Sequence, residues 1–586
     1  MTKKTVLCLL LIFMLSTTAG FCYNQSFRSV ATGNLLYGDF DNDLDPIYIW
    51  DNNGYRVYST LSNLTNHSDE FFSNNNSDVY LFGTSGNFSL PEIRGWESRS
   101  MFVVELSDYR DDANSGLDTD YNGSIDINGT GYMSGDRVQL FDNNGDNIFD
   151  TRANYLSTAD NYDIIKSRDW TLVHSYSLDE TVVGISFSHL GYGNNLVESN
   201  CHNSLFTFSN PAHIFSYSNR LVQSNLSGSD VYETRYETGD FLTTHETPAN
   251  IFHLALETPF YMIPNSEFRF DLAYEKQTNQ YNVNDNFSYF RDVSAGGVVD
   301  ITDNSESVEV DSSLGGSIFT PAARLTKHWN KTAYSWFDIS FGFGSFDANK
   351  TFSDRYNSET QTPLGANTEI TTHDYDDLVD QSGDTKHSNL RIAHKTVVDF
   401  TENFTFAAGF GYNYTSNKTD WDADFSTTYV VDYDNGDSIQ DLSDYTTTQT
   451  SSWSGNVVNN AKTTYITLPV AMEYKMKRWT FRLGAEHTIY RTTTDLDRKV
   501  ASSSPTTTVT VFGDSSVVTT TSDDDFTSWG NATEEQDSYT DFVYGLGFRA
   551  SKNLNVELLY YLGSPNTDIL NTNFYRNLRL SLTLLF

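Results

Sequence analysis

The sequence predicts an all-β fold, an up-and-down antiparallel β-barrel that crosses a membrane and carries long loops on its outer side. Apolar and polar side chains alternate with period two from about residue 97 to the last residue, as they do in strands with one apolar face. The connections between these segments alternate between short turns and polar stretches of tens of residues. The chain also begins with an export signal. A closed barrel fits this combination, because it pairs every backbone group that would otherwise face lipid.

Residues 1–22 have the layout of a cleaved export signal. Two lysines precede an apolar run at residues 6–15, and small residues follow it. The run is too short to span a hydrocarbon core of about 30 Å as a helix. Cleavage after Ala19 or after Cys22 satisfies the preference for a small residue at the cut, and the sequence does not choose between them. The bulky Phe21 disfavours the rival outcome, lipidation of Cys22.

The overall composition excludes several classes of protein. The chain has 77 acidic and 37 basic residues, and its net charge of −40 would repel nucleic acid, so nucleic-acid binding is not expected. Only three cysteines occur, so disulfides are not the main stabiliser. A mean hydropathy of −0.46, without a long apolar window after the signal, excludes a helical membrane protein. Aromatic residues make up 15% of the chain, which is typical of the two aromatic girdles of a membrane barrel.

Fourteen segments carry the alternating pattern. The last is the clearest, because its apolar face is formed by every second residue and ends on an aromatic at Phe586. The predicted strands lie near residues 97–107, 170–178, 182–190, 251–260, 266–276, 317–329, 333–344, 389–400, 403–414, 463–475, 479–489, 540–550, 553–562 and 576–586. Residues 55–61 and 79–90 are candidates for two more strands, joined to the strand near 97–107 through a turn at 91–96, which would raise the count to sixteen.

The lengths of the connections distinguish a barrel from a soluble sandwich, the alternative that alternation alone leaves open. Short turns, such as residues 330–331 and 477–478, fall at every other connection. Membrane barrels have short turns on the periplasmic side and long loops outside, whereas a soluble sandwich gives no reason for connections to alternate in length. We therefore expect a barrel of fourteen or sixteen strands with long extracellular loops.

On these features the sequence resembles bacterial outer-membrane β-barrel proteins. The signal, the hairpin-paired strands and the terminal strand Asn577–Phe586 carry the resemblance. It implies location in the outer membrane of a Gram-negative-type bacterium, contact with outer-membrane lipid, and recognition of the terminal strand by the barrel-assembly machinery. Porins, transporters, enzymes and adhesins share this pattern, so it does not specify an activity.

A strand number near fourteen, with a segment before the first strand, is also similar to the fatty-acid-transporter type of barrel, in which that segment plugs the lumen. The resemblance implies three parts: residues 1–22 as signal peptide, residues 23–53 as a periplasmic or plug segment, and residues 54–586 as the barrel. No residue-level motif carries the transport function of that family to this chain.

Two acidic stretches are candidate calcium sites. Carboxylate and amide oxygens at alternate positions can converge on one ion, and a glycine permits the sharp turn, but neither stretch has a glutamate at position twelve. The same composition is also ordinary for solvated turns. The residues are Asp118, Asp120, Asn122 and Asp126 in the first stretch and Asp142, Asn144, Asp146 and Asp150 in the second. A third run, with aspartates at 39, 41, 43 and 45, lacks the glycine.

No enzyme is expected, because no nucleophile elbow or zinc-protease motif occurs. The sequence predicts a passive channel or transporter for small solutes; the alternative is a structural or surface-interaction protein with a closed lumen and acidic, calcium-binding loops. The charges expected to face the lumen either tune a channel or pair with one another and with a plug. They are Arg269, Asp271, Glu275, Arg391, Lys395, Arg482, Glu486, Arg549 and Glu557. The net charge predicts a preference for cations.

Overall fold

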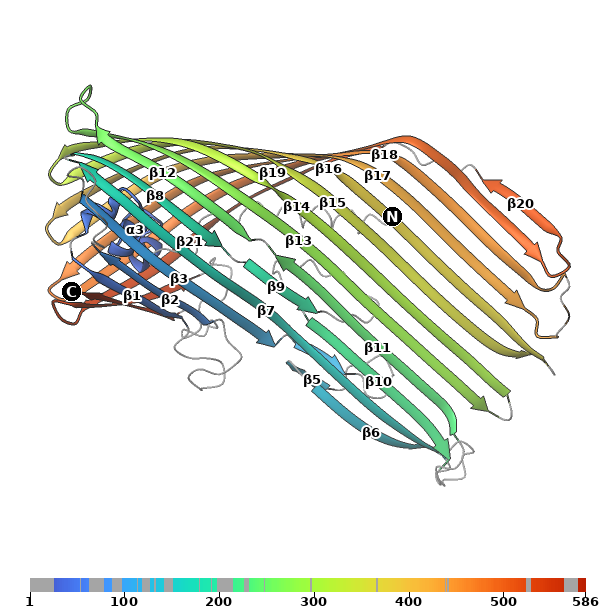
Figure 1. The fold of residues 1–586 in the computed structure, drawn as a ribbon. Helices are drawn as coiled ribbons and strands as arrows, with labels where there is room; N and C mark the ends of the chain where they lie inside the picture. Colours follow the sequence, from blue (N-terminus) through green and yellow to red (C-terminus); the bar gives the residue numbers. More distant parts are fainter. Residues whose placement is uncertain are drawn as a thin grey trace.

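In the computed structural model most of the chain after residue 25 forms one large antiparallel sheet (Figure 1). The structure describes residues 26–52, 54–62, 78–86, 97–112, 114–117, 127–130, 133–141, 151–178, 180–190, 192–197, 214–225, 231–246, 248–295, 298–364, 367–437, 439, 442–522, 529–562 and 578–586. The predicted signal, residues 1–22, lies outside the described residues.

In the described part of the chain, sixteen strands pair in a closed ring, each with the next of the sixteen in chain order, and the last pairs with the first. They are β1 (Arg56–Ser62), β2 (Asp78–Gly86), β3 (Glu97–Asp112), β7 (Thr151–Leu178), β8 (Thr181–Leu190), β12 (Ala249–Pro259), β13 (Ser266–Ala295), β14 (Val298–Asn330), β15 (Ala333–Leu364), β16 (Asn367–Thr401), β17 (Phe404–Asp434), β18 (Tyr445–Met476), β19 (Trp479–Phe512), β21 (Trp529–Arg549), β22 (Leu554–Leu562) and β23 (Leu578–Leu585).

All fourteen predicted strands are therefore present, but the count of fourteen is wrong. The two short strands that the sequence offered as an addition, β1 and β2, complete the ring. They are needed for closure, because β23 pairs with β1 through seven residues and would otherwise leave an open edge.

The outer face of the ring is an exposed apolar belt. On β13, Phe270 is 42% exposed, whereas its neighbour Arg269 is 4% exposed and points inward, as the alternation predicts. Other exposed apolar side chains follow around the ring: Phe82, Phe102, Leu172, Phe252, Phe341, Val470, Phe481 and Tyr544. Exposed aromatics also mark the rim near the short turns, namely Tyr261, Trp329, Phe400 and Phe586. Such a belt with an aromatic rim suits a barrel in lipid.

Seven consecutive strands, β13 to β19, continue far beyond this belt (Figure 1). About 9–11 residues of a tilted strand cross a hydrocarbon core, whereas β15 runs for 32 residues and β16 for 35. The expectation of long loops is wrong for three connections here. Residues 296–297 separate β13 from β14, residues 365–366 separate β15 from β16, and residues 435–444 separate β17 from β18.

The extension forms strands because its polar residues are largely ones that suit a sheet. Threonine is β-branched and favours extended backbone, and its hydroxyl pairs across strands. Cross-strand hydroxyl contacts of 2.8 Å between Thr385 and Thr419 and of 3.0 Å between Thr447 and Thr510 are examples. On the inner face of the extension, Trp421, Trp453 and their neighbours form a small apolar cluster.

Of the remaining strands in the described residues, five belong to the same sheet and two form a separate small hairpin. They are β4 (Asn114–Leu117), β5 (Ile127–Thr130), β6 (Met133–Phe141), β9 (Tyr192–Val197), β10 (Ile214–Asn225), β11 (Val231–Glu246) and β20 (Val517–Ser522). Within the described residues, β4 and β5 pair only with each other, and β11 pairs with the part of β13 that continues beyond the belt.

Before the ring, residues 26–52 fold into α2 (Phe27–Ala31), α3 (Asp39–Leu44) and the 3₁₀ turn η1 (Tyr48–Asp51). We call residues 26–52 the N-terminal segment. The Ser26 hydroxyl accepts a hydrogen bond from the Ser29 amide at the start of α2, as an N-cap does. Within the described residues, no helix is long and apolar enough to cross a membrane.

Candidate functional site: the lumen and the N-terminal segment

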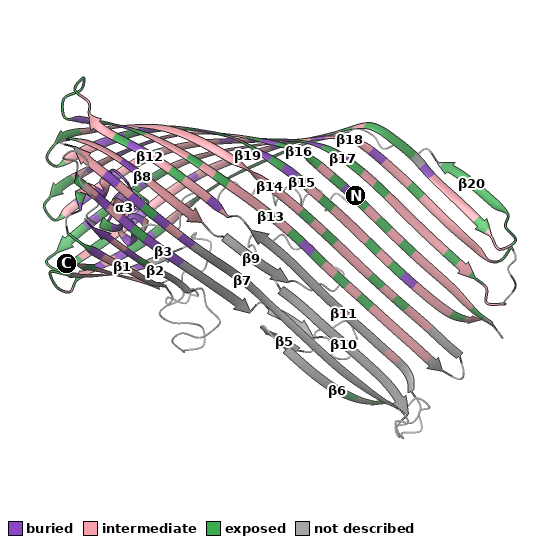
Figure 2. Cartoon of the chain, in the orientation of Figure 1, coloured by how far each residue is buried: buried purple, intermediate pink, exposed green. Residues whose placement is uncertain are grey.

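The N-terminal segment lies inside the barrel, at the end where the short turns and Phe586 are found (Figure 1), and buried residues gather around it (Figure 2). Three apolar clusters join it to strands on different sides of the ring. Phe40 and Ile49 pack with residues of β1, β2, β3 and β7; Leu35 and Leu36 with β16, β17 and β18; and Phe27 with β21 and β22. The segment therefore packs against strands on several sides of the ring.

Glycines on the inner face of the wall allow this close approach. A Cβ on Gly484 would lie 2.5 Å from the carbonyl oxygen of Ala31, and one on Gly545 would lie 2.7 Å from the Cβ of Ala31. A Cβ on Gly184 would collide with the carbonyl oxygen of Pro46. The strands therefore keep glycine where the backbone of the segment meets the wall, which is a common reason for glycine within a strand.

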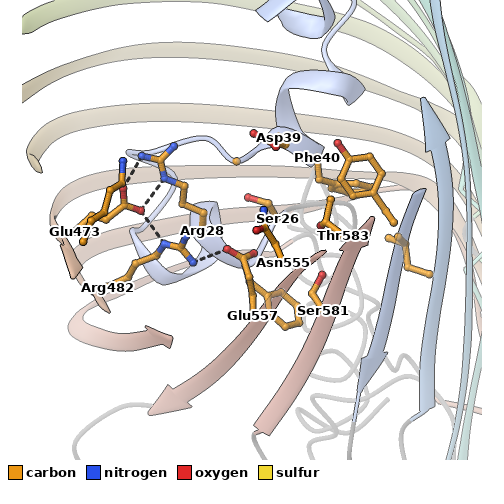
Figure 3. A pocket seen from close by; sticks show the side chains of 15 residues that line it. Ser26, Arg28, Asp39, Phe40, Glu473, Arg482, Asn555, Glu557, Ser581 and Thr583 are labelled. Atoms are coloured by element: carbon orange, nitrogen blue, oxygen red, sulfur yellow. Dashed lines mark hydrogen bonds and ion pairs between the residues drawn. The ribbon is translucent and has the colours of Figure 1, made fainter. Parts of the chain in front are cut away.

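A chain of alternating charges fixes one side of the segment (Figure 3). The guanidinium of Arg28 donates two hydrogen bonds of 2.9 Å to the two carboxylate oxygens of Glu473 on β18. Glu473 also accepts a hydrogen bond of 2.8 Å from Arg482, which donates another of 2.7 Å to Glu557. Glu473 is almost fully buried, at 1% side-chain exposure. Paired, bidentate geometry is what makes such a buried charge tolerable.

A second ion-pair group fixes the opposite part of the segment. Arg269 donates two hydrogen bonds, of 2.9 and 2.8 Å, to the carboxylate of Asp45, and it also binds Asp271 on its own strand. Tyr48 of the segment accepts a hydrogen bond of 3.3 Å from Arg324, which is paired with Asp338. The inward charges here pair with one another and with the segment, which is one of the two roles the sequence left open.

The aspartates of the segment have separate partners. Asp41 accepts hydrogen bonds of 2.6 Å from the amides of Ser26 and Gly38. Asp43 accepts from Tyr58 at 2.6 Å, and burial raises its pKa while these hydrogen bonds oppose the rise. Because these carboxylates point to different groups, they do not form one cation site.

Two inward cations on β16 differ from the others. Lys395 is 2% exposed, and its ammonium nitrogen has no hydrogen-bond partner in the described structure. It lies instead 3.8 Å from the ring centre of Tyr37 in the segment and 5.0 Å from that of Trp336 on β15. Arg391, four residues earlier on the same face, is exposed, and no ion pair joins it to another described residue. We call Lys395 and Arg391 the β16 cations.

A cavity of about 270 Å³ remains between the segment and the wall (Figure 3). It is lined by charged and polar groups of the first network, including Arg28, Glu473 and Glu557, and by Ser581 and Thr583 of β23. Its walls are hydrophilic, so it suits water and small polar solutes rather than an apolar ligand.

The predicted calcium ligands, Asp118 to Asp126 and Asp142 to Asp150, lie outside the described residues. Within those residues, no group of histidine, cysteine and acidic side chains has the geometry of a metal site. One serine–histidine pair is present on the outer face, where Ser100 Oγ lies 2.7 Å from His174 Nδ1. The other ring nitrogen of His174 has no partner in the described part of the chain, so the orienting third group of a catalytic triad is not seen there.

A closed ring with an apolar outside, an aromatic rim and a charged, filled inside decides the class. The architecture is that of an outer-membrane β-barrel. No protein-family model matches the sequence, and neither does any curated protein.

Solved structures of outer-membrane proteins are similar to this barrel at low scores. The FrpB iron transporter from Neisseria meningitidis is 10% identical, over 91% of this chain and 81% of that chain, with a TM-score of 0.25. The outer membrane transporter YddB from Escherichia coli is 7% identical over the same shares, with a TM-score of 0.24. The ferric-catecholate import receptor Fiu from E. coli K12 is 8% identical, over 91% and 82%, with a TM-score of 0.21. At these scores the functions of those proteins do not transfer to this chain.

Proposed function

We propose that the chain is a channel or transporter for small solutes in the outer membrane of a Gram-negative-type bacterium, with a lumen that the N-terminal segment plugs at rest. Solute passes when the segment moves. The main support is the position of the segment inside the ring, where it touches strands on nearly every side.

The contacts between the N-terminal segment and the barrel wall are of a kind that can break and re-form, which supports a segment that moves. It is joined to the first strand by the chain but is not part of the sheet, so moving it breaks no strand pairing. Its strongest polar attachments are two ion-pair groups, at Arg28 and Asp45. Ion pairs of this kind can be exchanged for water or for a competing ligand, whereas backbone ladders cannot without opening the barrel.

Single-channel conductance tests this proposal. The wild-type barrel, refolded into planar bilayers, is expected to be closed or nearly so. The double variant Arg28→Ala/Asp45→Ala is expected to open frequently, because it removes both attachments. Arg491→Ala/Glu534→Ala is the matched control, since it also removes one arginine and one acid, from an exposed ion pair in the extension. Equal conductance in all three proteins would contradict the proposal.

The long extension favours the second candidate, a surface-interaction protein. Its outward face carries exposed aspartates on adjacent strands; Asp384 pairs directly with Asp347 on one side and Asp420 on the other. A row of like charges is unfavourable unless cations screen it. For this candidate, calcium should bind and should protect residues 118–126 and 142–150 from hydrogen exchange. Unchanged exchange at millimolar calcium would argue against the predicted calcium loops.

A further inference from the structure

The ammonium group of Lys395 is buried without a hydrogen-bond partner in the described structure. A fully buried charge is costly unless it is paired and hydrogen-bonded. The two aromatic rings beside Lys395 offset part of that cost by cation–π attraction. They supply no hydrogen-bond acceptor to its three N–H groups.

The groups around Lys395 add donors and positive charge. The indole nitrogen of Trp336, an N–H donor, also has no partner in the described structure. Arg391 stands on the same face, about 13 Å further along β16 at the usual rise of a strand. The carboxylate that acts on Lys395, Asp41, is already held by the amides of Ser26 and Gly38.

The neighbouring wall contains few acids at this level. The inward residues paired with the β16 cations are Ser340 and Trp336 on β15 and Asn413 and Gly409 on β17. Two carboxylates of the neighbouring wall already have partners: Asp338 is bound by Arg324, and Asp399 accepts a hydrogen bond from Thr405. Much of the net negative charge lies elsewhere, including the exposed outward rows of the extension. The cation preference expected from the net charge therefore does not describe this part of the lumen.

We propose that Lys395, Arg391 and Trp336 form a binding site for a small oxyanion on the lumen wall, and that Tyr37 covers the site while the segment is in place. This inference rests on the proposed function, because it names the class of solute that the open lumen would accept. An oxyanion supplies the acceptors that the ammonium and indole N–H groups lack, and the two cations supply complementary charge. A cation or an apolar solute satisfies neither requirement.

The test is isothermal titration of the full chain in detergent with inorganic phosphate, at constant ionic strength set by sodium chloride. Tyr37→Ala uncovers Lys395 and is expected to bind phosphate about tenfold more tightly than the wild type, the gain typical of one charge-assisted hydrogen bond. Adding Lys395→Met should abolish the gain, whereas adding Lys395→Arg should retain it. Lys386→Met is the matched control, because Lys386 is exposed on the outer face of the same strand.

The inference is overturned if Tyr37→Ala binds phosphate no better than wild type, or if Lys395→Met leaves the gain intact. The heat-dependent gel mobility of each variant checks that the barrel has folded. Phosphate binding in detergent does not require conduction. The experiments therefore test the anion site and the proposed gate independently. Phosphate binding without any conducting variant would contradict the proposed gate alone, and conducting variants without phosphate binding would contradict the anion site alone.

Discussion

Arg28 and Glu473 are 445 residues apart in the chain, yet they meet inside the barrel through two parallel hydrogen bonds of 2.9 Å. The pair connects the first helix of the N-terminal segment to β18, and Arg482 extends it to β19. A carboxylate with 1% exposure between two arginines is thus the central attachment of the segment.

Replacing Glu473 should destabilise the barrel. Glu473→Gln removes the negative charge and leaves Arg28 and Arg482 facing each other, and breaking a buried pair in this way costs about 3–5 kcal/mol. Urea unfolding of the refolded protein, followed by tryptophan fluorescence, measures the loss. Glu534→Gln, in an exposed ion pair with Arg491, should change the free energy of unfolding by about 1 kcal/mol or less. Equal effects of both substitutions would contradict the buried network.

Adding a methyl group at Gly484 should loosen the segment without opening the barrel wall. The new Cβ would lie 2.5 Å from the carbonyl oxygen of Ala31, so the segment must shift. Gly484→Ala is expected to raise the open probability and to speed proteolysis within residues 26–52. Gly315→Ala is the control, because a Cβ there meets nothing within 4 Å. If the two variants behave alike, the close contact between segment and wall is not what the structure indicates.

The extension should lose stability as pH rises through the acidic range. Burial, followed by repulsion from Glu306, Asp377 and Asp376, raises the pKa of Asp354 to about 6. The folded extension therefore holds a proton that the unfolded chain releases. This stabilising contribution is complete below the ordinary carboxyl pKa near 4 and is lost as pH rises to about 6.

Asp354→Asn keeps this position neutral at every pH. Hydrogen exchange of residues 345–390 should be slower in the variant than in wild type at pH 7.5, after correction for intrinsic rates, and the same in both at pH 4. Asn349→Ala, an exposed and uncharged position on the same strand, is the control. A variant effect of equal size at both pH values would show that the raised pKa is not its cause.

The strands that cross the lipid were predictable because lipid imposes an apolar face. Alternation at Phe268, Phe270 and Tyr274 identified β13, and the same pattern located all fourteen predicted strands. The pattern stops where the belt ends, so apolar alternation predicts loops where the structure has the extension. Both faces of its strands carry many polar residues, mainly threonine, serine, asparagine and aspartate. A search for alternating apolar and polar residues therefore does not detect these strands. Long threonine-rich runs, as at residues 446–450, were the available signal.

The sequence predicts which charged side chains point into the lumen, but it does not predict which residues they pair with. Alternation places Arg269, Arg482 and Lys395 on the inner face, and the structure agrees. Which group of the segment each one meets depends on the path of the segment through the lumen, and the pairs Asp45–Arg269 and Arg28–Glu473, separated by 224 and 445 residues, carry no local pattern. Gly484 and Gly545 occupy inward positions of their strands and have no side chain. Glycine at such positions is a signal that another backbone packs closely against the strand.

A reversible lock tests most directly the claim that the segment closes the lumen. A Cβ on Gly33 would lie 3.5 Å from the Cβ of Pro469, within the range for a disulfide of about 3.5–4.5 Å. Gly33→Cys/Pro469→Cys, placed in the Arg28→Ala/Asp45→Ala background with Cys22→Ser and Cys201→Ser, ties the loosened segment to β18. We predict that the oxidised protein is closed in planar bilayers and that reduction restores the conductance of the loosened variant. Conductance that is the same before and after reduction, with the disulfide confirmed by mass spectrometry, would contradict the account.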